Sequence, residues 1–202
     1  MTIINSYTNG NLHVDLYEDG KKVRKWTGDP NPEHPESIDL KITDYCDAGC
    51  AYCHEGSTKR GNHASIDDID RITSGIPEGV EIAIGGGNPM SHPDLYSILT
   101  VFRDRGLIAN ITVNAIHIAQ EGDRLTSLQE EGLVYGIGVS GADHFYIHAI
   151  NDMIPEKNVV VHAIVGVDDP FDAMRSLTVC PRLLVLGYKQ FGRGIKFYDE
   201  NI

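Results

Sequence analysis

The feature that most constrains the fold of this chain is a regular alternation of short apolar segments with segments of helical periodicity. It starts at residue 37 and continues to residue 188. Strands joined by helical crossovers pair in parallel, because a right-handed crossover returns the chain to the same sheet in the same direction. The alternation therefore predicts an α/β fold. The expected strands are residues 38–43, 81–84, 108–114, 134–140, 159–166 and 183–188.

Helical segments are expected between these strands. Ser65 is a candidate N-cap for the first of them, and Gly106 and Gly132 follow the second and third, where a left-handed C-terminal residue belongs. The helical ranges with the clearest apolar faces or ends are 65–74, 92–105 and 123–131, with shorter helical segments at 144–151 and 171–177.

The side-chain pattern of two strands favours a barrel over an open sheet. In the first strand the polar residues Asp39 and Lys41 alternate with apolar ones, and in the fourth Gly136, Gly138 and Ser140 share one face. Small or polar residues on one face of parallel strands suit a barrel interior that holds a ligand. We therefore expect a partial (β/α)6 TIM-like barrel of parallel strands.

A β-hairpin is expected before the barrel, in residues 13–26, where two alternating segments flank the strong two-residue turn Asp19-Gly20. The prolines that follow make residues 28–36 a connector. The expected organisation is an N-terminal hairpin and connector in residues 1–36 and the partial barrel in residues 37–202.

Three of the four cysteines lie close together, directly after the first barrel strand. Cys46, Cys50 and Cys53 have spacings of four and three, whereas Cys180 stands alone and is expected to be a buried thiol. Thiolates this close on one loop can bind three irons of a [4Fe–4S] cluster, which leaves the fourth iron open for another ligand. The alternative is a structural zinc site with His63 as fourth ligand.

The cysteine spacing, with Tyr52 before the last cysteine, resembles the signature of the radical S-adenosylmethionine (SAM) superfamily. Residues 85–95, Gly-Gly-Gly-Asn-Pro-Met-Ser-His-Pro-Asp-Leu, are similar to that family's Gly-Gly-Glu-Pro segment and the His-Pro-Asp-Leu helix start that follows it. Two motifs in this order, each at the carboxyl end of a strand, are more specific than either alone. The chain thus resembles a small, single-cluster member of the superfamily.

The resemblance implies two cofactors: a [4Fe–4S] cluster and SAM, whose amino and carboxylate groups bind the open iron. In that family, reductive cleavage of SAM yields a 5′-deoxyadenosyl radical that takes a hydrogen atom from the substrate. An external electron donor such as flavodoxin or ferredoxin is implied as well. Asn88 stands where the family usually has glutamate, so a neutral amide replaces a carboxylate there. The residues that the resemblance implies at SAM are Tyr52, Gly85, Gly86, Gly87, Asn88, Ser140 and Gly166.

The polar strand faces and the carboxyl ends of the strands supply substrate candidates, and no individual catalytic residue is assigned. These polar residues favour a polar small-molecule substrate, with nucleoside-like or deazapurine-like compounds among the classes that small members of the family modify. Two alternatives stay open: an activase that installs a glycyl radical on a partner enzyme, and a non-catalytic iron–sulfur or zinc-binding module. The substrate candidates are Asp39, Lys41, Asn114, His162, Lys189, Gln190 and Arg193.

The charge and the N-terminus limit the expected partners. Seventeen basic against twenty-nine acidic residues give a net charge of −12, which does not favour a nucleic-acid partner. No stretch approaches the roughly 20 apolar residues of a membrane span, and no secretory signal is present, so a cytoplasmic address is expected. Few residues follow the last strand, so we expect the substrate, a second copy of the chain or a partner protein to close the open side of the barrel.

Overall fold

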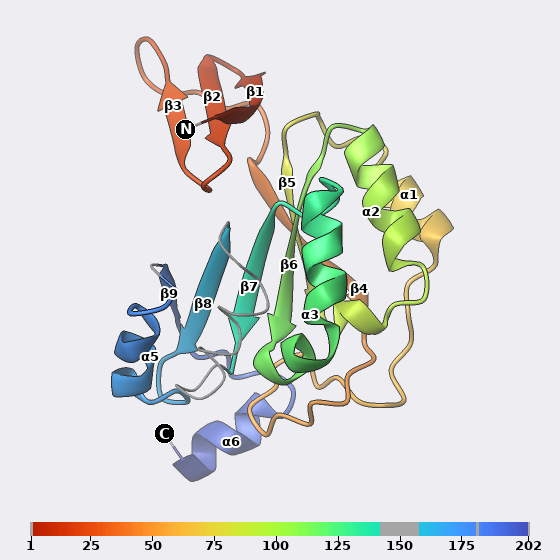
Figure 1. The fold of residues 1–202 in the computed structure, drawn as a ribbon, viewed down its shortest axis with the longest axis vertical. Coiled ribbons are helices and arrows are strands. Elements are labelled where there is room, and N and C mark those ends of the chain that lie inside the picture. Colours follow the sequence, from red (N-terminus) through yellow and green to blue (C-terminus); the bar gives the residue numbers. More distant parts are fainter. Residues whose placement is uncertain (1, 142–157, 181, 202) are drawn as a thin grey trace.

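The computed structural model describes residues 2–141, 158–180 and 182–201. These residues form a three-stranded antiparallel sheet, in the order β1-β2-β3, and a six-stranded parallel sheet, in the order β4-β5-β6-β7-β8-β9 (Figure 1). The expected α/β fold with six parallel strands is confirmed. The helical segment expected at residues 144–151 lies outside the described residues.

The strands of the large sheet follow the order of the chain, and all five neighbouring pairs are parallel. Sequential parallel pairing is the arrangement that repeated β-α units with one crossover hand produce. All carboxyl ends therefore meet at one end of the sheet. The strands are β4 (Ser37–Thr43), β5 (Glu81–Gly86), β6 (Ile108–Asn114), β7 (Gly136–Ser140), β8 (Val159–Ile164) and β9 (Leu183–Leu186).

Three helices cover one face of the large sheet: α1 (Ile66–Thr73), α2 (Leu95–Asp104) and α3 (Ala115–Glu130) (Figure 1). Ile82 and Ile111 of the sheet, Leu99 and Phe102 of α2 and Ile118 of α3 belong to one core and are at most 1% exposed. Burying each such side chain is worth about 1.5–3 kcal/mol, so this interface contributes strongly to the stability of the fold. None of the described helices is long and apolar enough to cross a membrane.

Two helices differ from the expected ranges. Helix α3 begins at Ala115 rather than at residue 123, because Oδ1 of Asn114 accepts a hydrogen bond from the Ile116 amide (3.1 Å) and caps the helix. Helix α2 begins at Leu95, after a 3₁₀ turn, η1 (Pro89–Ser91).

The segment that follows the last strand is also helical. Besides α5 (Pro170–Ser176), which was expected, the structure contains α6 (Gly194–Asn201), which was not. This segment is not a free tail: α6 and the turn before it lie at the carboxyl ends of the strands, beside the cysteine-bearing loop (Figure 1). Closure of the open side of the barrel by the substrate, a second copy or a partner protein stays a prediction.

The face of the large sheet opposite the helices carries small and polar residues. On this face Asn110 of β6 pairs with Gly136 of β7. A Cβ on Gly136 would lie 2.5 Å from Oδ1 of Asn110, and a Cβ on Gly138 would lie 2.5 Å from Cε1 of His162. The glycines of β7 therefore make room for side chains from both neighbouring strands.

The N-terminal unit has one more strand than the expected hairpin. Its strands are β1 (Ile3–Asn9), β2 (Leu12–Tyr17) and β3 (Lys22–Lys25). The hairpin β2-β3 is confirmed, but its turn has three residues rather than two. The Gly20 amide donates to the Tyr17 carbonyl (3.0 Å), and the Tyr17 amide donates to the Lys21 carbonyl (2.9 Å). Gly20 has φ 83°, the left-handed conformation that closes a three-residue turn.

This small sheet lies at the end of the barrel where the strands begin (Figure 1). The Tyr135 hydroxyl, just before β7, donates to the Tyr17 carbonyl (2.5 Å). The ammonium group of Lys22 pairs with the carboxylate of Glu81 at the start of β5. The N-terminal sheet therefore closes the amino end of the barrel and leaves the carboxyl end for a site.

Candidate active site

The three cysteines lie on a long loop that leaves the carboxyl end of β4. Their thiols are free and half-buried. Hydrogen bonds tie the loop to itself: the Cys46 amide donates to the Thr58 carbonyl (3.0 Å), and the Thr58 amide donates to the Asp44 carbonyl (3.2 Å). Gly49 adopts φ 69°, which side chains rarely allow. The cysteines therefore lie on a formed loop rather than on a loose segment.

The glycine-rich segment after β5 lies directly against this loop. The Gly87 amide donates to the Thr43 carbonyl (2.7 Å), and the Asn88 amide donates to the Tyr45 carbonyl (2.6 Å). A Cβ on Gly87 would lie 2.0 Å from the Tyr45 carbonyl oxygen, so only glycine permits this approach. The structure thus places the two sequence motifs in contact.

The side chain of Asn88 has a local role. Its Oδ1 accepts a hydrogen bond from the Met90 amide (3.2 Å), and its Nδ2 donates to Oγ of Ser91 (2.9 Å). Both polar atoms of the Asn88 side-chain amide are therefore hydrogen-bonded to residues of the η1 turn. A Cβ on Gly85 would meet nothing within 4 Å, so open space adjoins the backbone there. Contacts of Gly85, Gly86, Gly87 and Asn88 with SAM stay predictions, and the open space favours the backbone of Gly85 for them.

The donor set fits a [4Fe–4S] cluster. Besides the three free thiols, Nδ2 of Asn114 lies 3.7 Å from Sγ of Cys50, where it can donate a hydrogen bond to sulfur. Burial raises the pKa of the Cys46 thiol, so the free side chain favours its protonated form. A bound metal favours the thiolate instead. Within the described ranges no three His, Cys, Asp or Glu side chains surround one metal-ion position. In a cubane cluster each thiolate binds a different iron, so the three sulfurs need not converge on one position.

The fourth ligand of the zinc alternative is engaged elsewhere. Nδ1 of His63 lies 2.9 Å from Oγ1 of Thr43. Its ring stacks on Tyr45 with 5.7 Å between centroids and meets the ring of His92 at 5.0 Å. These contacts hold His63 against the end of β4, and they give the zinc alternative no support.

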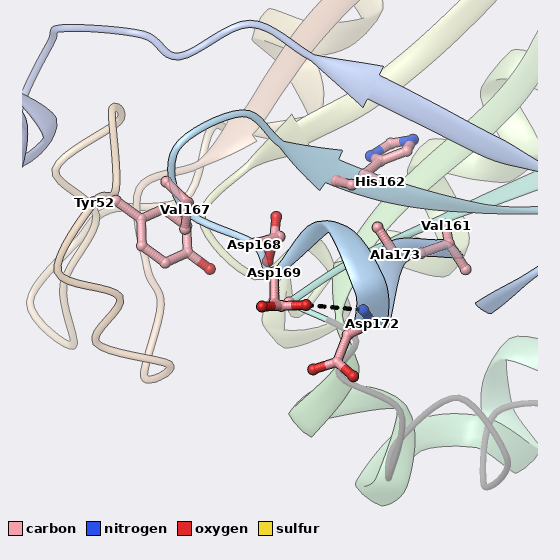
Figure 2. Close-up of a pocket in the computed structure, with 10 residues that line it drawn as sticks. Tyr52, Val161, His162, Val167, Asp168, Asp169, Asp172 and Ala173 are labelled. Carbon is pink, nitrogen blue, oxygen red and sulfur yellow. Dashed lines mark hydrogen bonds between the residues drawn. The ribbon is translucent and has the colours of Figure 1, made fainter. Parts of the chain in front are cut away.

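A cavity of about 240 Å³ opens between the cysteine loop and the carboxyl end of β8. Tyr52 reaches toward it from the cysteine loop, and its hydroxyl points toward Asp168 and Asp169 (Figure 2). Burial raises the pKa values of Tyr52 and Asp168, so both groups favour their protonated forms more than they do in water. Ser140 ends the neighbouring strand, and the exposed Gly166 precedes Asp168 on the loop after β8.

Among the substrate candidates, His162 lines this cavity. Its ring lies over Gly138 on the inner face of the barrel, and its Nδ1 is 3.5 Å from Oγ of Ser140. Burial lowers its pKa, so the imidazole is neutral at pH 7 and can both donate and accept a hydrogen bond. Asn114 is close to the cysteines instead, since its amide caps α3 and approaches Cys50.

The two candidates on β4 are exposed. The ammonium group of Lys41 lies 2.6 Å from the carboxylate of Asp44 and 2.9 Å from that of Glu55. Both carboxylates belong to the cysteine loop, which folds over the end of the strand. A substrate contact of Asp39 or Lys41 stays a prediction.

The three candidates after β9 lie on the turn that precedes α6. Lys189 and Gln190 are exposed. Arg193 instead contacts the cysteine loop: Nε donates to the Cys50 carbonyl (2.9 Å), and Nη1 donates to the Ser57 carbonyl (2.9 Å). The guanidinium of Arg193 thus donates hydrogen bonds within the protein. A substrate contact by Lys189, Gln190 or Arg193 stays a prediction.

Two further residues at the site belong to no sequence motif. Nε2 of the buried His117 lies 2.7 Å from Oδ1 of Asp47, next to the first cysteine. Phe197 on α6 meets Tyr52 edge-on, with 5.8 Å between ring centroids. From the sequence, only Asn114, as a candidate N-cap, could have predicted that His117 lies in the first turn of a helix. No comparable pattern marks α6.

Comparison with known proteins identifies the family. The family model of the radical SAM superfamily matches residues 40–169. One curated relative is GTP 3′,8-cyclase of Cronobacter sakazakii, 29% identical over 145 residues, which covers 66% of this chain and 42% of that protein. Another is GTP 3′,8-cyclase of Photorhabdus laumondii subsp. laumondii, 29% identical over 143 residues, which covers 68% of this chain and 39% of that protein. The chain thus spans about two fifths of the length of these relatives.

Solved structures of Streptococcus suis SuiB share the fold. SuiB bound to its precursor peptide SuiA has a TM-score of 0.60 at 17% identity, over 79% of this chain and 40% of that chain. SuiB bound to SAM has a TM-score of 0.60 at 16% identity, over 78% of this chain and 42% of that chain. The family match covers more than half of the sequence, including all three cysteines. The chain belongs to the radical SAM superfamily, a family of enzymes that use a [4Fe–4S] cluster and SAM.

Proposed function

We propose that this chain uses a single [4Fe–4S] cluster, held by its cysteine loop, to act on a polar small molecule in the barrel interior. The observation that carries the proposal is the contact between the cysteine loop and the carboxyl end of a barrel with a small and polar inner face. When bound, the cluster and SAM supply the means to remove a hydrogen atom from a carbon that no protein side chain can activate.

The residues of the chain have three tasks in this proposal. Cys46, Cys50 and Cys53 hold the cluster. The backbone at Gly85, beside open space, offers polar groups to SAM. Tyr52, packed against α6, covers the flank of the loop and limits the access of water.

The residues that line the cavity favour a substrate without a polyphosphate group. Lys41 is paired with two carboxylates, and Asp168 and Asp169 line the cavity. A nucleoside triphosphate needs cationic partners for its phosphates. The curated relatives are named for GTP, but the cavity of this chain offers the neutral imidazole of His162 among carboxyl groups. We therefore favour a neutral polar substrate such as a nucleoside-like or deazapurine-like compound.

Anaerobic reconstitution with iron and sulfide tests the enzyme. The wild-type chain should bind about four irons and release 5′-deoxyadenosine from SAM when dithionite is added. Cys50→Ala should lose the cluster and the cleavage. The matched variant Cys180→Ala should keep both, because Cys180 is a buried thiol whose Sγ lies 3.3 Å from the Val159 carbonyl oxygen, at the start of β8. Bound zinc without SAM cleavage would overturn the proposal.

A substrate panel tests the second half of the proposal. Nucleosides and deazapurines are compared with the corresponding 5′-triphosphates for their ability to stimulate 5′-deoxyadenosine formation. Stimulation by the uncharged compounds supports the substrate class. Stimulation by triphosphates alone contradicts the proposed substrate class but not the assignment as a radical SAM enzyme. Loss of a hydrogen atom from a glycine of a partner enzyme would instead support the activase alternative.

A further inference from the structure

We propose that Arg193 is a positioning residue for the iron–sulfur cluster: it fixes the shape of the cysteine loop and places a positive charge beside it. This inference rests on the proposed function, because it takes the three cysteines as cluster ligands. It goes further, because Arg193 lies after the last strand, far along the chain from either motif.

Three hydrogen bonds join Arg193 to the cysteine loop. Its amide donates to the Cys53 carbonyl (3.0 Å), its Nε to the Cys50 carbonyl (2.9 Å) and its Nη1 to the Ser57 carbonyl (2.9 Å). Two of the three acceptors belong to cysteines that bind iron in the proposed function. The loop between them cannot change shape without breaking these bonds. A planar guanidinium with its donors in a fixed fork suits this task better than a flexible ammonium group.

The chain around Arg193 is shaped for this close contact. A Cβ on Gly192 would lie 2.6 Å from the carbonyl oxygen of His54 and 2.9 Å from the amide nitrogen of Gly56, so the two backbones meet without a side chain between them. Gly192 also has φ 52°, which favours glycine. On the other side, the Tyr188 hydroxyl donates to the Gly194 carbonyl (2.6 Å) and holds the turn closed.

The charge of Arg193 matters as well as its shape. Its side-chain acceptors are neutral carbonyl oxygens, so these bonds do not neutralise the guanidinium. A [4Fe–4S] cluster becomes more negative when it is reduced, and a nearby positive charge stabilises that form. Arg193 is therefore expected to raise the reduction potential of the cluster in addition to retaining it.

Two variants separate the shape from the charge. Arg193→Gln removes both the positive charge and the planar guanidinium donors, whereas Arg193→Lys keeps the charge and removes the planar donors. Lys196→Ala is the matched control, because Lys196 lies on α6 with its side chain 81% exposed. Folding of each reconstituted protein is checked by circular dichroism. The readouts are the rate of iron loss to a chelator and the reduction potential from an EPR-monitored titration.

We expect Arg193→Gln to lose iron at least about tenfold faster than the wild type, the size of effect seen when partners of metal ligands are removed, and to show a lower reduction potential. Arg193→Lys should lose iron faster but keep a potential near that of the wild type, and Lys196→Ala should match the wild type in both. A folded Arg193→Gln with wild-type iron retention and potential overturns the inference. If that variant does not fold, a folded Arg193→Lys with unchanged iron retention overturns it. A wild-type chain that binds no cluster overturns the proposed function itself, and the inference with it.

Discussion

The two ends of the barrel are held in different ways. At the end where the strands begin, charged side chains meet: the guanidinium of Arg24 lies 2.6–3.0 Å from the carboxylate oxygens of Glu36, and Lys22 pairs with Glu36 and Glu81. At the end where they finish, backbone groups and glycines hold the cysteine loop against Gly87 and Gly192, and the side chains of Lys41 and Arg193 add contacts with the loop.

The difference shows which end can serve a ligand. Charged side chains that pair with one another satisfy each other's hydrogen bonds, so these groups at the amino end already have partners within the protein. Backbone bonds around glycine fix the backbone of the cysteine loop, and its three cysteines form no disulfide. The thiols of the cysteine loop and the space beside Gly85 therefore stay accessible to cofactors. Substitutions at the two ends should then have different effects, large on the cluster at one and limited to stability at the other.

The largest effect is expected for Gly87→Ala. The new Cβ would lie 2.0 Å from the carbonyl oxygen of Tyr45, which is backbone and cannot move aside alone. We expect a loss of more than about 3 kcal/mol, beyond the usual range for an overpacked core, and no cluster uptake. Gly75→Ala is the control, because its Cβ would meet nothing within 4 Å. Denaturant unfolding and iron analysis measure both effects, and a cluster-bearing Gly87→Ala of normal stability would show that the loop tolerates displacement.

A smaller effect is expected for Gly138→Ala, inside the barrel. Its Cβ would lie 2.5 Å from the ring of His162, a side chain that can turn at a cost. We expect a destabilisation of about 1–3 kcal/mol. In a His162→Ala background the same substitution should cost much less, because the ring is gone. Equal costs in both backgrounds, measured in a double-mutant cycle, would mean that the ring does not occupy this space.

The sequence predicted the parts of the fold that repeat and the part that carries a motif. Six strands with alternating helices and a cysteine loop beside a glycine segment follow from apolar periodicity and from residue spacing. Helix α6 and strand β1 could not be predicted, because many of their side chains are exposed and neither has a clear apolar pattern. The contacts of Arg193 with the cysteine loop could not be predicted either, because they join residues more than 130 positions apart in the sequence.

At the amino end, Tyr135→Phe removes the hydrogen bond from the Tyr135 hydroxyl to the Tyr17 carbonyl. We expect a loss of about 1 kcal/mol, typical of one hydrogen bond between neutral groups, with unchanged iron content. Tyr96→Phe is the control, since Tyr96 is 52% exposed and its hydroxyl bonds to Glu131 at the surface. Cluster loss in Tyr135→Phe would show that the two ends are coupled.

The smallest effect is expected for the ion pair of Arg24 and Glu36. The Arg24 guanidinium lowers the pKa of the Glu36 carboxyl, so the pair stabilises the fold above the ordinary glutamate pKa of about 4.3. That contribution is lost as the pH falls through the lowered value, because the unfolded chain then binds the proton first. Arg24→Gln should therefore cost about 0.2–1 kcal/mol at pH 7, and less below pH 4. Arg103→Gln, at the exposed Arg103–Asp104 pair of α2, is the matched control. Urea unfolding at both pH values measures the difference, and a cost for Arg24→Gln that does not fall with pH would show that the pair does not supply this stability.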